Sequence, residues 1–195
     1  MSFTDPEAVV VMMPDGGFRP ACNPQLALET GPGPIVGLDV TSTGAGRARL
    51  EPMVEQIVER TGRQPDTVLV DGGFFSRDSV TRLTRAGVEL LMPLPKPRRR
   101  DRTPDQPVPD DTPQVAALRR RMHEAGIQER YRQRARRIEW TNAGYRNRGW
   151  RQVLVRGRDK VRAVAGWRAM AHTLRCILRA EALATVFGLA VFRSA

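Results

Sequence analysis

The stretch Thr67-Val68-Leu69-Val70-Asp71-Gly72-Gly73-Phe74-Phe75 predicts a short buried strand that ends on a carboxylate. Its apolar run is of the kind that buried parallel strands use. The two glycines allow the backbone to turn sharply and to come close to a ligand. Open α/β sheets place their chemistry at the carboxyl ends of central strands, so Asp71 is a candidate functional residue. The alternative, a solvated aspartate in a plain strand-to-helix turn, stays open on spacing alone.

The elements around this stretch predict an α/β protein with a mixed sheet. Upstream, short β-rich segments separated by turns predict an antiparallel meander of three strands, Val9–Met13, Arg19–Thr30 and Ile35–Thr41. An amphipathic helix then runs from Leu50 to about Gly62, and a second helix, capped by Ser76 and ended by Gly87, follows Asp71. Val88–Leu94 predicts a further strand. This alternation favours crossover connections, with the later strands joining the same sheet in parallel.

The second half of the chain differs in composition. Pro93–Pro113 holds seven prolines and the basic run Lys96–Arg102, which predicts an extended linker. Residues 114–147 are predicted to be mostly helical with a break at Gly126, and a last helix covers Asp159–Leu178. We therefore expect a mixed-sheet part over 1–95, a linker over 96–113, an arginine-rich helical part of the same core over 114–179 and an apolar tail over 180–195.

Charge points to a polyanionic partner. The 195 residues include 32 basic and 21 acidic ones, a net charge of +11, which fits nucleic acid or an anionic surface. The two cysteines, Cys22 and Cys176, have no metal-ligand spacing and predict a reducing, cytoplasmic setting. No signal-peptide pattern opens the sequence, and the apolar tail is shorter than the roughly 20 residues of a membrane span.

Arginines dominate residues 119–151, with eleven arginines and only three glutamates. Such a run is usually a solvated helix face. Here the charge is too one-sided for pairing within the helices to explain it, and aromatic rings are interleaved, which suits contacts with phosphates and bases. The candidate DNA-binding residues are Tyr131, Arg132, Arg134, Arg136, Arg146, Arg148 and Arg151. Trp140 fits a core anchor equally well.

Glu139 is the second candidate carboxylate. It could simply neutralise the surrounding arginines, or it could bind a metal ion whose positive surroundings hold substrate phosphates. Together with Asp71 it fits a Mg²⁺ site, because Mg²⁺ is commonly held by one or two carboxylates plus phosphates. Two such ions about 3.5–4 Å apart would support in-line attack at phosphorus.

At this point the chain resembles the DDE transposases of bacterial insertion sequences, over roughly residues 5–178. The resemblance rests on the order and spacing of several segments: Asp5-Pro6-Glu7-Ala8, Pro14-Asp15-Gly16-Gly17-Phe18-Arg19-Pro20, Val70-Asp71-Gly72-Gly73-Phe74, Tyr131…Arg134…Glu139, Arg146-Asn147-Arg148-Gly149 and Ala169-Met170-Ala171-His172-Thr173-Leu174. It implies an RNase H-like core that cuts and joins DNA at transposon ends with Mg²⁺ or Mn²⁺. By this resemblance Asp71 matches the second catalytic aspartate and Glu139 the glutamate, both as metal ligands. Tyr131 and Arg134 match the tyrosine and arginine of the glutamate helix, and Arg146 a basic position after it.

One departure from the family pattern concerns the first catalytic aspartate. It belongs on a strand upstream of the Asp-Pro-Glu-Ala segment, and Asp39 is a poor substitute because its position matches a later strand. We therefore expect an incomplete RNase H-like sheet without its first strand, as in a truncated transposase that is inactive alone. Two alternatives to an active fragment stay open: a remnant that only binds DNA, and a basic binding module unrelated to transposition. Transposases act as assembled multimers, which implies a homo-oligomer, although no dimer seam stands out.

Overall fold

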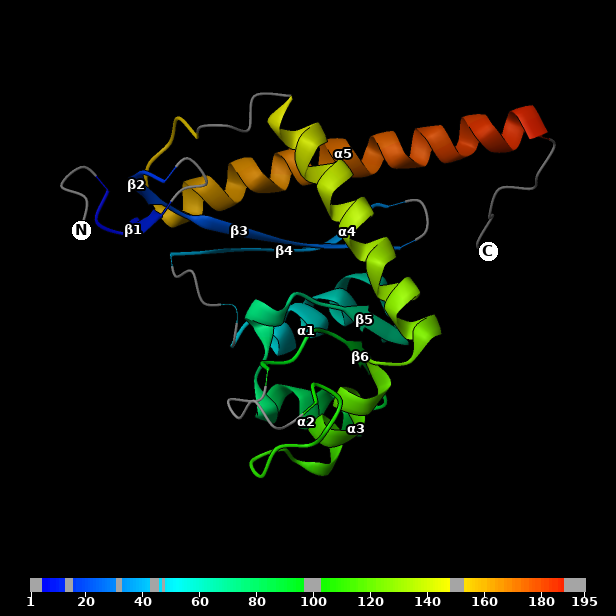
Figure 1. Ribbon diagram of the computed structural model, residues 1–195. Helices are drawn as coiled ribbons and strands as arrows, with labels where there is room; N and C mark the ends of the chain where they lie inside the picture. Colours follow the sequence, from blue (N-terminus) through cyan, green and yellow to red (C-terminus); the bar gives the residue numbers. More distant parts are fainter. Residues whose placement is uncertain are drawn as a thin grey trace. The chain divides into compact units, whose positions relative to one another are not determined.

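The computed structural model describes residues 5–12, 16–30, 33–42, 46, 48–96, 103–147 and 153–187, apart from the side chains of residues 136, 137, 145, 146 and 182–187. The chain divides into two compact units (Figure 1). One comprises residues 1–44 and 145–195, and the other residues 45–144.

Four strands of the first unit form two antiparallel pairs. β1 (Val9–Met12) pairs with β2 (Phe18–Ala21), and β3 (Asn23–Leu28) pairs with β4 (Ile35–Thr41). The strand predicted over Arg19–Thr30, at an edge or interrupted at Pro24, is divided at Cys22. The predicted three-stranded meander is wrong, because the two pairs are separate sheets among the described strands. β1 begins at Val9, opposite Ala21, so the residues after Ala21 have no partner there and pair with β4 instead.

The long helix α5 (Arg158–Phe187) packs one face on β4. Leu38 and Val40 of the strand form a small core with Val161 and Ala165 of the helix. The helix extends nine residues beyond the predicted end at Leu178, into the predicted apolar tail, because residues 179–187 contain neither glycine nor proline. Among the described residues no helix is both long and apolar enough to cross a membrane.

Two acidic side chains close the N-terminus of α5. Asp5 Oδ2 accepts a hydrogen bond from the Gly157 N–H at 3.0 Å, and Glu7 Oε2 accepts one from the Arg158 N–H at 2.9 Å. These N–H groups have no partner within the helix, and the negative charges also suit its positive end. Gly157 has a φ of +85°, and a Cβ there would lie 3.2 Å from Glu7 Oε2. The two hydrogen bonds to the N-terminus of α5 give the acidic residues of the Asp5–Ala8 segment a structural role.

Removing the Glu7 carboxylate is expected to lower the free energy of unfolding by about 1 kcal/mol, the usual cost of losing a helix N-terminal cap. Urea denaturation of Glu7→Ala, followed by circular dichroism, measures the loss. Glu29→Ala, at an exposed position outside the helix terminus, is the control. Equal stability of the two variants would contradict a capping role for Glu7.

The second unit alternates helices with two parallel strands. In chain order it comprises α1 (Leu50–Thr61), β5 (Thr67–Leu69), the short 3-10 helix η1 (Gly72–Phe74), α2 (Arg77–Arg85), β6 (Glu89–Leu91), α3 (Pro113–Arg121) and α4 (Ala125–Arg146). β5 and β6 pair in parallel, from Thr67 opposite Glu89 to Leu69 opposite Leu91, which confirms the predicted crossover. The described strands of the whole chain nevertheless form three two-stranded sheets, so the predicted joining of the later strands to the earlier sheet is not seen among them.

The core of this unit comes from the apolar faces of its helices and strands. Val80 and Leu83 of α2 pack with Val88, Leu90 and Met92 around β6, as the helical spacing after Ser76 predicts. Ser76 occupies the N-cap position of α2, but its side chain makes no capping hydrogen bond. The mixture of helices and strands confirms the α/β class.

The break in the arginine-rich helical part falls before Gly126, not at it. α3 ends at Arg121 and α4 begins at Ala125, so Gly126 lies inside α4. The start of α3 is fixed by Thr112, whose Oγ1 accepts the Val115 N–H at 3.3 Å.

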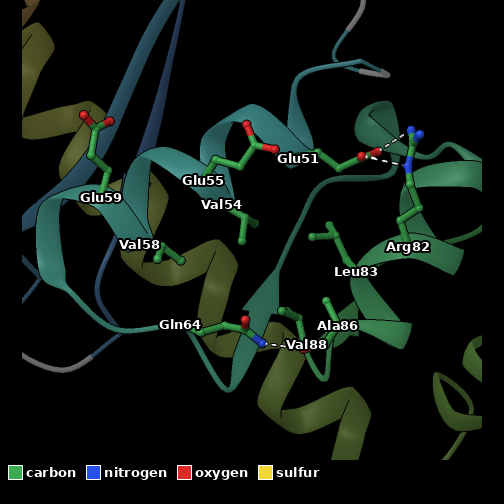
Figure 2. A pocket seen from close by; sticks show the side chains of 10 residues that line it. All are labelled: Glu51, Val54, Glu55, Val58, Glu59, Gln64, Arg82, Leu83, Ala86 and Val88. Atoms are coloured by element: carbon green, nitrogen blue, oxygen red, sulfur yellow. Dashed lines mark hydrogen bonds and ion pairs between the residues drawn. The ribbon is translucent and has the colours of Figure 1, made fainter.

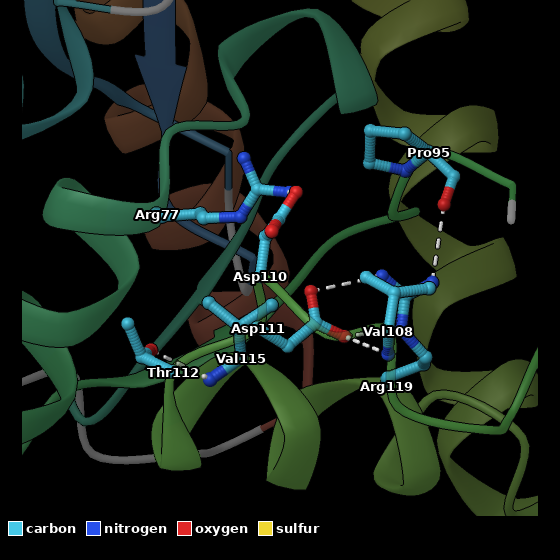
Figure 3. Close-up of polar contacts among 8 residues, drawn as sticks. All are labelled: Arg77, Pro95, Val108, Asp110, Asp111, Thr112, Val115 and Arg119. Atoms are coloured by element: carbon cyan, nitrogen blue, oxygen red, sulfur yellow. Dashed lines mark hydrogen bonds and ion pairs between the residues drawn. The ribbon is translucent and has the colours of Figure 1, made fainter. Parts of the chain in front are cut away.

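The proline-rich segment, predicted to be extended, is packed at its C-terminal end (Figure 3). The Asp111 side chain is fully buried there and forms two hydrogen bonds with Arg119, Nε to Oδ2 at 2.9 Å and Nη2 to Oδ1 at 3.2 Å. Arg119 also donates to the Pro95 carbonyl at 3.1 Å. The buried bidentate ion pair therefore ties the C-terminal end of this segment to α3, and the hydrogen bond to Pro95 ties its N-terminal end to the same helix.

Candidate active site

Asp71 stands at the end of β5, as the sequence predicts. The Val70 N–H donates to the Leu91 carbonyl at 2.9 Å, so the parallel pairing extends to the residue before the carboxylate. Asp71 then caps η1, its Oδ1 accepting the Gly73 N–H at 3.1 Å. Gly72 suits this turn, because a Cβ at that position would lie only 3.1 Å from the Pro93 carbonyl oxygen. The Asp71 side chain is 63% exposed and thus accessible to a ligand.

Helix α4 brings Tyr131 and Arg134 to this strand end. The Tyr131 hydroxyl donates to the Val70 carbonyl at 2.9 Å. Burial raises the pKa of Tyr131, and the nearby Asp71 charge adds to the effect, whereas Arg134 opposes it. A raised pKa keeps the phenol protonated at neutral pH, so the hydroxyl continues to donate and holds α4 against the end of β5.

Arg134 pairs directly with the candidate catalytic carboxylate. Its Nη2 lies 3.4 Å from Asp71 Oδ2, and its guanidinium carbon lies 5.8 Å from the centre of the Tyr131 ring. The Arg134 side chain is only 18% exposed, and its Nε is buried without a hydrogen-bond partner among the described residues. A buried donor without an acceptor is costly, so the ion pair with Asp71 holds this guanidinium against an unfavourable burial.

Several other arginines of this region bind carboxylates of the same unit. Glu89, at the start of β6, accepts hydrogen bonds from Thr67 at 2.7 Å and from Arg121, and forms an ion pair with Arg130 at 3.3 Å. Burial favours the protonated form of Glu89, but these partners outweigh it, so the net effect is a lowered pKa. Arg119 is likewise engaged by Asp111. These arginines therefore hold α3 and α4 to the rest of the unit.

Glu139 lies farther along α4 than Arg134. It is exposed on α4, five residues beyond Arg134. Five residues correspond to a net rotation of about 140° and a rise of about 7.5 Å along an α-helix, so Glu139 projects from a different face than Arg134. In the part of the chain that the structure describes, no hydrogen bond or ion pair joins Glu139 to Asp71.

Among the remaining candidate DNA-binding residues, the structure describes the side chain of Arg132 only. Arg132 is 67% exposed and pairs with Glu129 one turn earlier on α4, at 3.1 Å. The side chains of Arg136 and Arg146, and all of Arg148 and Arg151, lie outside the described residues. Trp140 is 58% exposed, which favours the surface alternative over a core anchor within this unit.

The described residues supply suitable donors for a divalent cation but not a complete set. Carboxylate oxygens such as those of Asp71 are the ligands that Mg²⁺ prefers. However, no group of three or more His, Cys, Asp or Glu side chains that could hold a metal ion occurs among the residues described. Asp39, the poor substitute for the first aspartate, belongs to the first unit, and its Oδ1 accepts the Val40 N–H at 2.8 Å.

Two structurally important groups were not predicted. Glu89 and Asp111 form ion pairs with the arginines of α3 and α4, yet no sequence motif marks either residue. The sequence signal for Asp111 is only its place beside the helix start at Thr112-Pro113. Tyr131 and Arg134, predicted to bind DNA, also contact Val70 and Asp71 within the chain.

An accessible carboxylate at a parallel strand end, paired with an arginine-rich helix, defines a basic α/β protein with a polar site suited to phosphate chemistry. The chain matches the family model of the transposase DDE domain over residues 12–174. It therefore belongs to the transposase DDE domain family, whose members generally use a divalent metal and act on DNA. Neither the curated proteins nor the solved structures give a match to this chain.

Proposed function

We propose that this chain acts on DNA transposon ends in the cytoplasm, with Asp71 and Glu139 as carboxylate ligands for Mg²⁺ or Mn²⁺ within an RNase H-like core. The proposal is supported above all by the pairing of Asp71 with Arg134, which places a positive donor beside the carboxylate that the sequence motif suggests. A metal ion bound there would supply Lewis-acid activation of a phosphodiester. Because no group of three such ligands occurs among the described residues, the proposal requires further carboxylates or substrate phosphates to complete the metal site.

The chain's own residues have separate roles in this proposal. Tyr131 anchors α4 to the end of β5, so the register between helix and strand is maintained. Arg134 orients Asp71 through its Nη2, and the exposed part of its side chain contacts a DNA phosphate. Arg132, exposed on the same helix, binds the backbone of the duplex through its guanidinium.

A second candidate function is DNA binding without strand cleavage, by an inactive member of the family. The observation that favours it is the ion pair of Asp71 with Arg134, which occupies this carboxylate, while Glu139 projects from a different face of α4 than Arg134. The third alternative, a basic module unrelated to transposition, is wrong because of the family membership.

Loss of α4 arginines is expected to weaken DNA binding and to reduce its dependence on salt. Each phosphate contact contributes about 0.9 to the slope of log K against log salt, so Arg132→Gln/Arg134→Gln should lower that slope by about 1.8. Fluorescence anisotropy with a labelled duplex at several salt concentrations measures it.

The matched control is Arg121→Gln/Arg130→Gln, which removes the same charge from arginines that bind Glu89. Its slope should stay close to that of the unaltered chain. Equal slopes for the two double variants would show that net charge alone binds DNA, and would remove the proposed roles of Arg132 and Arg134.

A further inference from the structure

A groove between α1 and α2 is lined entirely by residues of the second unit (Figure 2). Its volume is about 460 Å³, which is within the range of ligand-binding clefts. Val54 of α1, Leu83 of α2 and Val88 are buried and form its apolar floor. Val58, one turn after Val54, is 37% exposed and therefore accessible to an occupant of the groove.

Polar contacts hold the two sides of this groove together at both ends. Glu51 pairs with Arg82 through both carboxylate oxygens, Nε to Oε2 at 2.8 Å and Nη2 to Oε1 at 2.9 Å. At the other end, Gln64 Nε2 donates to the Ala86 carbonyl at 2.7 Å. These contacts join α1 and the residues after it to α2. The groove is thus formed before any occupant binds, which lowers the entropic cost of binding.

Helix α1 presents two parallel rows of side chains to this groove. Glu51, Glu55 and Glu59 form an acidic row, and Val54 and Val58 form an apolar row, both at intervals of four residues. Residues four apart lie on the same face of a helix, with a rise of about 6 Å between them. An occupant that is itself an α-helix repeats its side chains at the same interval and can match both rows.

The acidic row is a local exception on a strongly basic chain. Arg82 neutralises Glu51, whereas Glu55 and Glu59 are exposed and form no ion pair within the part of the chain that the structure describes. Their charge repels DNA phosphates and attracts cations. The net charge of +11 repels a cationic occupant overall, so binding requires the local negative charge together with apolar contact.

We propose that the α1–α2 groove binds a basic amphipathic helix of another protein. Aliphatic side chains of that helix contact Val58 and Leu83, and its arginines or lysines pair with Glu55 and Glu59. An amphipathic helix that lays its apolar face in a groove is a recurring mode of peptide recognition. This site is formed by other residues than Asp71 and the arginines proposed to bind DNA, so it adds a protein partner to the proposed function.

A designed peptide tests the proposed recognition directly. The probe is a fluorescein-labelled, alanine-rich helical peptide of about 15 residues, long enough to form helix, in which leucine and arginine each recur every four residues. Fluorescence anisotropy with the full chain should show saturable binding. Two control peptides, one with glutamate for each arginine and one with glutamine for each leucine, should not bind.

Variants of the chain assign the binding to the groove. Glu55→Lys/Glu59→Lys should weaken binding by at least about tenfold, because it replaces two attractions with two repulsions. Val58→Gln should weaken it by about fivefold through loss of apolar contact. The control Glu29→Lys/Asp66→Lys makes the same charge change at exposed positions outside the groove and should bind as the unaltered chain does. Circular dichroism shows that each variant is folded.

Three outcomes would overturn the proposal. Equal affinities of the groove variant and the control variant would place the peptide elsewhere. Equal binding of the arginine and glutamate peptides would exclude charge recognition. No binding of the arginine peptide, with a change of oligomeric state on Val58→Gln in analytical ultracentrifugation, would assign the groove to a second copy of this chain.

Discussion

Asp111→Ala is expected to lower the free energy of unfolding of the second unit by about 3–5 kcal/mol, the cost of leaving one charge of a buried pair uncompensated. The Asp111 side chain has no exposed area, and that of Arg119 is 4% exposed. Figure 3 shows the two side chains joined by dashed lines beside α3. Without the carboxylate, the Arg119 guanidinium and the Val108 N–H lose a buried acceptor.

The neighbouring residue supplies the control. Asp110 is 83% exposed and lies 3.8 Å from Arg77, an exposed pair worth at most about 1 kcal/mol. Urea denaturation should therefore place Asp110→Ala near the unaltered chain and Asp111→Ala far below it. The double variant Asp111→Ala/Arg119→Met should be more stable than Asp111→Ala, because it removes the uncompensated charge as well. Similar midpoints for Asp110→Ala and Asp111→Ala would refute the stabilising role of the buried pair.

The Asp111–Arg119 pair should also make the free energy of unfolding depend on pH in the acidic range. Burial alone would raise the pKa of Asp111, but hydrogen bonds from Arg119 and Val108 and the charge of Arg119 make the net shift a lowering. A carboxyl group with a lowered pKa stabilises the fold fully above its unfolded pKa of about 3.9, and this contribution is lost as the pH falls toward the folded value. Unfolding free energies measured below pH 4 should therefore fall more steeply in the unaltered chain than in Asp111→Ala.

Asp71→Asn is expected to abolish divalent-cation-dependent cleavage of supercoiled DNA, with a loss of more than about a hundredfold, since even indirect partners of a bound metal cost 10–100-fold. The substitution keeps the shape of the side chain and its acceptor for the Gly73 N–H, so η1 should remain intact. It removes the charge that binds a cation and pairs with Arg134. The fold should be little affected, because the carboxylate is 63% exposed.

Gel electrophoresis with Mg²⁺ or Mn²⁺ measures this cleavage, and Asp78→Asn, an exposed aspartate on α2, is the matched control. Cleavage that persists in Asp71→Asn would assign the activity to another site or to a contaminant. Intact DNA with the unaltered chain, together with salt-dependent binding, would favour the second candidate function, in which the chain binds DNA without cutting it.

Local pattern was enough to predict the elements that carry the candidate site. The apolar run before Asp71 forms β5, and the helical spacing after Ser76 forms the buried face of α2. Both depend on interactions within a few residues, which sequence periodicity reports directly. The pairing of the strands was harder to predict from the sequence. The segment from Arg19 to Thr30 has an extended pattern, yet its two halves pair with different strands, because β1 is too short to pair with both.

The sequence by itself determined the carboxylate at a strand end, the excess of arginine and the family, since these depend on residue type and order. Only the tertiary structure decided what each arginine does. Arg119, Arg121, Arg130 and Arg134 are alike as residues, but their partners Asp111, Glu89 and Asp71 come from other segments, up to 63 positions away along the chain. An ion pair forms where packing brings two charges within a few ångströms, and that distance depends on the whole fold.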